Sequence, residues 1–544
     1  PGSSLLTTPP PCSARPRARA AERPAMGSCV GNPSSELPPA RPQKKARSSP
    51  ASPSAGPGLE VPTIQQEQVI PKYRGRDISE RYFLAPKPLG AGAFGTVSRA
   101  VHRTRGVVRA IKTVPHGGSK VMRALRAEIA TMQAMDHPNV IKLYAAYEDK
   151  ASSYLVMEIC EGGELLDRIL DATFFSERDA AFVMEQMLRA VHYIHSMDIV
   201  HRDLKLQNFL LSSPDRLENN TLKLIDFGFA CNCPQGDVLR SCVGTPLYMA
   251  PEVLERRYDS QCDMWSVGVI LYAMLSGHAP FQGKNEHEIF QKVKRGSFSL
   301  SGHIWQAVSS SAKDLICQLI AMNPQERITA ERALQHTWIR REKPASQKVI
   351  EQHLARRLLT FRVRNKLERA VLKIVAHHLH EDKVRDLRAA FEALDANRDG
   401  VLTTEELREG LARAGFAEDC LDVHCMLAMA DVNGNGKIDY SEFLAATLDR
   451  HHHLSDDALL AAFCIFDRDG SGRITEQELR RVLCSCSCAT EDCCRPAILQ
   501  LLSDVDLSGD GLIDFEEFKR MMQSWKEDAC AGGTPVSRPS LGGA

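Results

Sequence analysis

Residues 201–208 read HRDLKLQN, and this stretch is one of five short motifs that follow one another in a fixed order. The others are GAGAFGTV at 90–97, RAIK at 109–112, DFG at 226–228 and APE at 250–252. A glycine-rich turn lets backbone N–H groups approach phosphates closely, because glycine has no side chain. A lysine on the next strand and the carboxylates further on supply charges suited to phosphate and to a hard metal ion. Together these residue types predict a site that binds phosphate and a metal ion.

The ordered set resembles the signatures of Ser/Thr protein kinases, and we place this domain at residues 82–339. The resemblance implies ATP as the donor, Mg²⁺ as the cofactor and Ser or Thr hydroxyls of proteins as acceptors. Asp203 would accept the hydroxyl proton, and Lys205 would neutralise the γ-phosphate. Lys112 would contact the α- and β-phosphates, with Glu128 holding it in place. The metal ligands would be Asn208 and Asp226.

The resemblance also gives the nucleotide pocket. Its expected ATP contacts, together with Lys112, are Leu89, Gly90, Ala91, Gly92, Ala93, Phe94, Gly95, Val97, Ala110, Met157, Glu158, Cys160 and Leu210. Two scaffold roles are implied as well: Asp263 would brace the catalytic loop, and Arg327 would pair with Glu252.

Two features depart from the kinase pattern. The catalytic loop has Gln207 where many relatives have Glu, so Glu164 remains as the candidate contact for a basic substrate. In the activation segment ACNCPQGDVLRSCVGT, Arg202 needs an anionic partner. Asp237 could serve permanently and a phosphorylated Ser241 conditionally, and the sequence favours Asp237. Thr245 is expected to contact Asp203 and Lys205 instead.

A second kind of motif repeats towards the C-terminus. Four windows fit D-x-[DNS]-x-[DNS]-G-x5-E: DANRDGVLTTEE (395–406), DVNGNGKIDYSE (431–442), DRDGSGRITEQE (467–478) and DLSGDGLIDFEE (506–517). Calcium takes six to eight oxygen ligands, and a glycine at position 6 allows the sharp turn that wraps them around the ion. Four such windows, each flanked by apolar helical pattern, predict EF-hand loops and resemble calmodulin.

The expected calcium ligands occupy positions 1, 3, 5, 7 and 12 of each loop. They are Asp395, Asn397, Asp399, Val401 and Glu406; Asp431, Asn433, Asn435, Lys437 and Glu442; Asp467, Asp469, Ser471, Arg473 and Glu478; and Asp506, Ser508, Asp510, Leu512 and Glu517. The aliphatic residue at position 8 suits a short strand that pairs neighbouring loops.

Residues 354–379 read LARRLLTFRVRNKLERAVLKIVAHHL, with seven Lys or Arg and one acid. Apolar residues recur at helical spacing, which predicts a basic amphipathic helix. It is tethered to an acidic region, because residues 381–528 contain 32 Asp or Glu against 16 Lys or Arg. The helix could instead lie on a membrane surface, pack on the kinase as a solvated helix, or bind separate calmodulin.

A kinase, a basic helix and four EF-hands in one chain resemble the calcium-dependent protein kinases. The resemblance implies that the junction restrains the kinase at low calcium and that the loaded EF-hand domain relieves the restraint. Arg356, Arg357 or Arg362 would then mimic a basic substrate. The alternative is a calcium-sensing scaffold with an inert kinase fold.

The fold class expected is α+β multidomain: a bilobal protein-kinase fold followed by an all-α calmodulin-like domain. The expected division is a disordered extension (1–80), the kinase domain (82–339), an autoinhibitory junction helix (340–384), four EF-hands (385–525) and a flexible tail (526–544). We expect a monomer whose partners are protein substrates and whose junction contacts its own EF-hands, with no nucleic acid.

The N-terminal region contains MGSCV at residues 26–30. If translation starts at Met26, Gly27 could accept myristate and Cys29 palmitate, and two such signals anchor a protein to a membrane. The 17 cysteines show no small-scaffold disulfide framework, which favours free thiols and an intracellular, cytoplasmic location. The cluster Cys484–Cys494 could be a thiol-rich linker or a metal or redox site.

Overall fold

The computed structural model describes a defined set of residues, all within the compact unit Val61–Ala544. These are 70–92, 95–172, 175–341, 354, 357–358, 366–379, 381–416, 422–448, 454–483 and 495–523. The candidate lipidation sites Gly27 and Cys29 therefore lie outside the described residues, as does the cluster Cys484–Cys494. The expected fold class is confirmed, because a mixed sheet with helices is followed by a helical EF-hand region.

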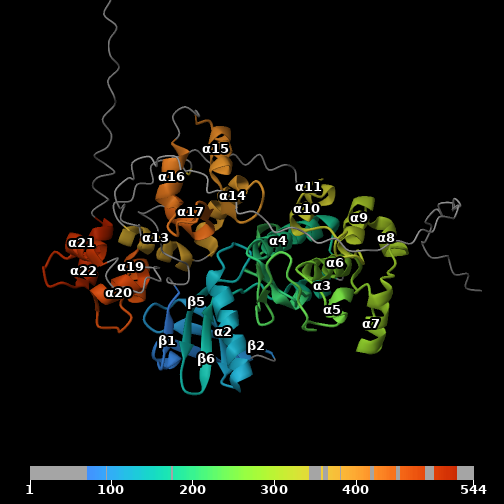
Figure 1. Cartoon of the computed structure of the whole chain (residues 1–544), viewed down its shortest axis with the longest axis horizontal. Helices are drawn as coiled ribbons and strands as arrows, with labels where there is room; N and C mark the ends of the chain where they lie inside the picture. The colour runs from blue at the N-terminus through green and yellow to red at the C-terminus, as the bar shows by residue number, and fades with distance from the viewer. Residues whose placement is uncertain are drawn as a thin grey trace, which may run out of the picture. The chain divides into compact units, whose positions relative to one another are not determined.

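A six-stranded sheet forms the first lobe of the kinase domain (Figure 1). Its spatial order is β1-β5-β6-β4-β3-β2, and β1 pairs with β5 in parallel while the other pairs are antiparallel. The strands are β1 (Lys72–Arg74), β2 (Tyr82–Gly92), β3 (Gly95–His102), β4 (Val108–Pro115), β5 (Leu143–Glu148) and β6 (Ser152–Met157). Helix α2 (Ser119–Ala134) packs against β5 and so lies next to the sheet.

The prediction of disorder is wrong for residues 70–80. Ile70 is buried, and the short strand β1 pairs with β5 from Lys72 to Arg74. A 3-10 turn at Ile78–Glu80 follows, capped by the Asp77 side chain. Tyr73 stacks on Tyr147 with 4.6 Å between the ring centroids. Residues 70–80 have little periodic pattern, so their order could not be predicted from the sequence. They are ordered by contact with β5, a strand about 70 residues further along the chain, on which Tyr73 stacks.

The second lobe is mainly helical. Helix α6 is buried from Cys262 to Ser276, which is the pattern of a central core helix. Ser176 caps α4, because its side chain accepts the N–H of Asp179. The helices are α3 (Leu165–Ala172), α4 (Glu177–Ser196), α5 (Pro251–Leu254), α6 (Gln261–Ser276), α7 (Glu286–Arg295), α8 (His303–Ala307), α9 (Ser310–Leu319), α10 (Ala330–Leu334) and α11 (Thr337–Arg341). Two short antiparallel strand pairs flank the catalytic loop: β7 (Ile199–Val200) with β10 (Cys231–Asn232), and β8 (Phe209–Leu211) with β9 (Leu222–Leu224).

The EF-hand region consists of short helices on either side of four loops. Its elements are α14 (Glu381–Leu394), β11 (Val401–Leu402), α15 (Thr404–Arg413), α16 (Val423–Ala430), β12 (Ile438–Asp439), α17 (Tyr440–Thr447), α19 (Asp456–Phe466), β13 (Arg473–Ile474), α20 (Glu476–Leu483), α21 (Arg495–Val505), β14 (Ile513–Asp514) and α22 (Phe515–Gln523). Leu402 pairs with Ile438, and Ile474 pairs with Ile513. The prediction that position 8 joins neighbouring loops is therefore confirmed.

Helix α13 (Lys366–His378) belongs to the core of the EF-hand region. Its predicted apolar stripe is buried there, and Leu354 and Leu358 upstream belong to the same core. The polar side of α13 is buried as well, since Glu368 and Lys373 are 0% exposed. Amphipathic spacing correctly predicted the apolar stripe but gave no sign that the charged residues opposite it are also covered.

Candidate active site and calcium loops

The nucleotide end of the candidate active site is built on a strand, a helix and the loop that contains Asp226. Lys112 lies on β4, and its Nζ is 2.6 Å from Glu128 Oε1 on α2 and 3.2 Å from Asp226 Oδ1. Burial opposes the charge on Lys112, but the two carboxylates outweigh it and raise the pKa of the ammonium. Burial likewise opposes ionisation of Asp226, but Lys112 outweighs it and lowers the pKa of that carboxyl. Lys112 and Asp226 therefore favour each other's charged form.

The catalytic loop brings a second set of polar groups together. Asp203 Oδ2 accepts from Lys205 Nζ at 2.6 Å, and Asp203 Oδ1 accepts from the Thr245 hydroxyl at 2.6 Å. Lys205 also reaches Thr245 at 3.4 Å. The Asn208 amide donates to the backbone carbonyl of Asp203 at 2.8 Å. The contacts expected of Thr245 are confirmed.

Asp263 anchors the catalytic loop through hydrogen bonds. Its two oxygens accept the backbone N–H groups of His201 and Arg202, each at 2.8 Å, and His195 Nε2 lies 2.9 Å away. Burial opposes ionisation of Asp263, but the bonds and charges of the histidines outweigh it and lower its pKa. Arg202 is held at φ +68°, a left-handed conformation that L-residues rarely adopt. The expected bracing role of Asp263 is thus seen in its hydrogen bonds.

The other expected scaffold contact is a buried ion pair. Arg327 Nη1 lies 2.5 Å from Glu252 Oε1, and Nη2 lies 3.1 Å from Oε2. Such a two-pronged pair fixes the start of α5 against the segment before α10.

Strand register places several of the residues expected to contact ATP. Ala110 on β4 is opposite Met157, the last residue of β6, and Val97 is opposite Lys112. The Glu158 side chain pairs with Lys223 at 3.1 Å. Between β2 and β3, Ala93 and Phe94 lie outside the described residues. Gly95 has φ +135°, and a Cβ there would lie 2.1 Å from the Thr113 carbonyl oxygen, so this turn requires glycine.

Arg202 does not contact the residue that the sequence favours. Its Nη1 donates to the Ser241 hydroxyl at 2.7 Å and its Nε to the Phe229 carbonyl at 2.7 Å. Among the described residues, no ion pair joins Arg202 to Asp237. The preference for Asp237 is therefore wrong, because the path of the activation segment brings Ser241 to the arginine.

The two residues considered for substrate preference also have positions in the structure. Gln207 is part of a 3-10 turn, and its buried side-chain oxygen has no hydrogen-bond partner among the residues that the structure describes. Glu164 lies beside Leu210 in an isolated bridge. Burial and the nearby Asp167 raise the pKa of Glu164.

All four predicted calcium loops share one arrangement. The position-6 glycine is left-handed in each, with φ between +77° and +83°, and its N–H donates to the position-1 aspartate. The position-12 glutamate turns into the loop and accepts backbone N–H groups from it. In the third loop, ligand atoms of Asp467, Asp469 and Glu478 lie within 4.8 Å of one another. These hard oxygen donors fit calcium.

The candidate autoinhibitory arginines are only partly described. Arg357 Nη1 donates to the carbonyl of Thr447 at the end of α17, at 3.3 Å. Arg356 and Arg362 lie outside the described residues. In this structure Arg357 therefore contacts the EF-hand region.

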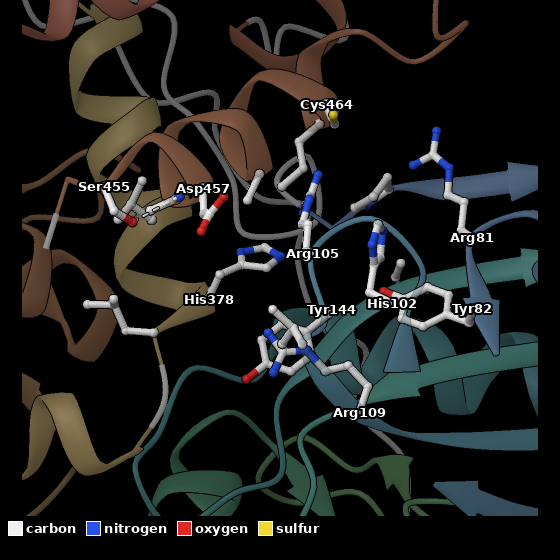
Figure 2. A pocket seen from close by; sticks show the side chains of 18 of the residues that line it. Arg81, Tyr82, His102, Arg105, Arg109, Tyr144, His378, Ser455, Asp457 and Cys464 are labelled. Carbon is white, nitrogen blue, oxygen red and sulfur yellow. Dashed lines mark hydrogen bonds between the residues drawn. The ribbon is translucent and has the colours of Figure 1, made fainter. Parts of the chain in front are cut away.

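A pocket of about 290 Å³ was not predicted from the sequence. Figure 2 shows Arg81, Arg105 and Arg109 around it, together with Asp457 and Cys464. Burial and these arginines lower the pKa of His102 to about 4. Successive residues of a strand face opposite sides, so Arg109 faces away from Ala110 and the nucleotide cleft. No sequence motif marks this pocket, because its lining comes from distant segments.

The fold and these two sites define a protein kinase joined to a calcium-binding domain of the EF-hand type. Residues 83–339 match the protein kinase domain, and residues 384–448 and 456–523 match the EF-hand domain pair. Within the described residues, no helix is both long and apolar enough to cross a membrane.

Similar proteins extend over most of the chain. Calcium-dependent protein kinase 5 of Plasmodium falciparum is 40% identical over 472 residues, which cover 86% of this chain and 82% of that protein. Calcium-dependent protein kinase 9 of Arabidopsis thaliana is 38% identical over 95% of this chain and 93% of its own length. Calcium-dependent protein kinase 21 of the same plant is 40% identical, with shares of 82% and 84%. The chain belongs to the calcium-dependent protein kinase family.

Proposed function

We propose that the protein transfers the γ-phosphate of ATP to Ser or Thr hydroxyls of proteins when calcium binds its own EF-hands. One observation supports this most strongly. Lys112 lies between Glu128 and Asp226, while Asp203 is linked to Lys205 and Thr245. An inert scaffold would not need both sets of charged groups to be complete and assembled.

In this proposal each group of the active site has one task. Asp203 orients the acceptor hydroxyl and takes its proton. Lys112 and Lys205 provide positive charge for the phosphates, and Glu128 keeps Lys112 in position. The carboxylate of Asp226 and the amide oxygen of Asn208 are hard donors that fit Mg²⁺, which would neutralise charge on the phosphates when bound. Glu164 would contact the substrate.

Calcium regulation forms the second half of the proposal. The shared geometry of the four loops supports four calcium sites. At low calcium the junction would restrain the kinase, with Arg356, Arg357 or Arg362 in the place of a basic substrate. At high calcium the EF-hand region would hold the junction, and the burial of Leu358 and α13 in its core supports this part. Because the junction and the EF-hand region belong to one chain, each is present to the other at an effective concentration of about millimolar.

The remaining parts of the proposal concern location and assembly. We place the protein in the cytoplasm as a monomer, attached to membranes through Gly27 and Cys29 if these are acylated. Its partners would be protein substrates and its own junction, with no nucleic acid.

The catalytic half is tested by Asp226→Asn in the full chain. Removing one carboxylate charge beside Lys112 should lower phosphorylation of a Ser peptide, measured with ATP, Mg²⁺ and Ca²⁺, by about a hundredfold or more. Calcium binding should not change. Asp314→Asn is the matched control, because Asp314 is an exposed carboxylate on α9, 60% accessible to solvent. Full activity of Asp226→Asn would reject the assigned metal ligand.

A further inference from the structure

Lys373 reaches from α13 into the second calcium loop. Its Nζ lies 2.9 Å from Oε1 of Glu442, and both side chains are 0% exposed. Glu442 is the position-12 residue of that loop, the one that would give both oxygens to calcium. The junction helix thus places a positive charge on an expected calcium ligand.

The other three loops provide a comparison within the same molecule. In every loop, the position-12 carboxylate accepts the backbone N–H groups of positions 2, 3 and 9, at 2.9–3.3 Å. Glu442 has these contacts and the Lys373 ammonium in addition. Among the described residues, no lysine or arginine pairs with Glu406, Glu478 or Glu517. The contact is therefore specific to the second loop.

The surroundings of Lys373 make the contact hard to break without moving the helix. Leu372 and Ile374, its neighbours on α13, are 0% exposed in the EF-hand core. Asp439, at position 9 of the loop, and Asp136 also act electrostatically on Lys373. Charges interact much more strongly in a buried setting than in water, so a calcium ion and this ammonium at one carboxylate would repel each other strongly.

We infer that Lys373 competes with Ca²⁺ for Glu442, lowers the calcium affinity of the second loop and couples that loop to the junction helix. Calcium entering this loop displaces the ammonium from Oε1, and the helix that carries the lysine must adjust. The reciprocal also holds, because any state in which the Lys373 ammonium has left Glu442 favours calcium in the second loop. This inference deepens the proposed function and rests on it, since it assumes that the second loop binds calcium.

The test isolates the second loop in the full chain. Glu406→Gln, Glu478→Gln and Glu517→Gln together weaken the other three sites, and CaCl₂ binding to this parent is measured by titration calorimetry. Adding Lys373→Met should tighten binding about tenfold or more, because three carboxylates then face the ion without a competing charge. Lys373→Arg, which keeps the positive charge, should bind as weakly as the parent.

A second lysine controls for charge alone. Lys383 lies on α14, outside the four calcium loops, and is exposed to solvent. Lys383→Met removes the same charge where solvent screens it, so the affinity should change by less than about threefold. An equal effect of the two Met variants would overturn the inference.

The outcomes separate the inference from the proposed function. If the parent binds no calcium, the second site itself is rejected. If it binds calcium and Lys373→Met leaves the affinity unchanged or weaker, the inference alone is rejected. Circular dichroism checks folding of each variant, and Lys373→Gln, a neutral polar replacement, serves if the methionine variant is unfolded; it too should bind calcium more tightly.

Discussion

Arg202 joins the catalytic loop to the activation segment through the hydroxyl of a serine. Its two side-chain bonds go to Ser241 and to the carbonyl of Phe229, and Tyr258 donates to the Ser241 carbonyl at 2.6 Å. Ser241 is therefore fixed from both sides. The segment between the DFG and APE motifs is anchored at this point by neutral partners of a charged guanidinium.

Whether Ser241 or Asp237 is the functional partner of Arg202 can be measured by replacing each residue with alanine. Ser241→Ala removes a hydrogen bond to a charged group, a contact of about 1.5–3 kcal/mol, and should lower kcat/KM severalfold by loosening the activation segment. Asp237→Ala should change kcat/KM less than twofold, because Arg202 does not contact it. Both are measured with calcium and a Ser peptide. A larger loss for Asp237→Ala would support the sequence-based preference instead.

At the residue scale, the sequence predicted the contacts among the catalytic residues but not the partners of Arg202 and Lys373. Lys112, Glu128 and Asp226 could be assigned because their motifs come in a fixed order, and the structure brings them within 3.2 Å. The partner of Arg202 depends on the path of the activation segment, which no local pattern specifies. Lys373 was visible in the basic helix, but its contact with Glu442 depends on how α13 enters the EF-hand core.

At the scale of elements, helix α13 has two functions. Its apolar residues complete the core of the EF-hand region, and its lysine reaches a calcium loop. Periodicity predicted the helix and its apolar stripe. It could not predict the burial of the opposite face, because that requires knowing which elements pack around the helix.

Ile374→Ala tests the packing role of α13. The side chain is 0% exposed, so its truncation should lower the free energy of unfolding of the EF-hand region by about 2–5 kcal/mol. Calcium-loaded protein is unfolded with urea and followed by circular dichroism. Arg369→Ala on the same helix is the control, because Arg369 is only partly buried and should cost about 1 kcal/mol or less. Equal effects would mean that α13 does not complete this core.

At the scale of the whole molecule, two sites with different chemistry lie in the kinase domain and in the EF-hand region. The kinase core and the EF-hand core are separate hydrophobic clusters, and α13 belongs to the second. The sequence predicted this division, because catalytic motifs and calcium repeats occupy separate stretches. The prediction that disorder extends to residue 80 is wrong, because residues 70–80 are ordered by contact with β5.

In the proposed function, calcium controls phosphoryl transfer through the region after the kinase domain. It is tested most directly by measuring phosphorylation of a Ser peptide, with calcium or with a chelator, for the intact chain and for a chain ending at Arg341, the last residue of α11. The intact chain should be active only with calcium, and the shortened chain, once shown to be folded, should be equally active in both. An intact chain that is as active in chelator as in calcium would show that calcium does not control the kinase.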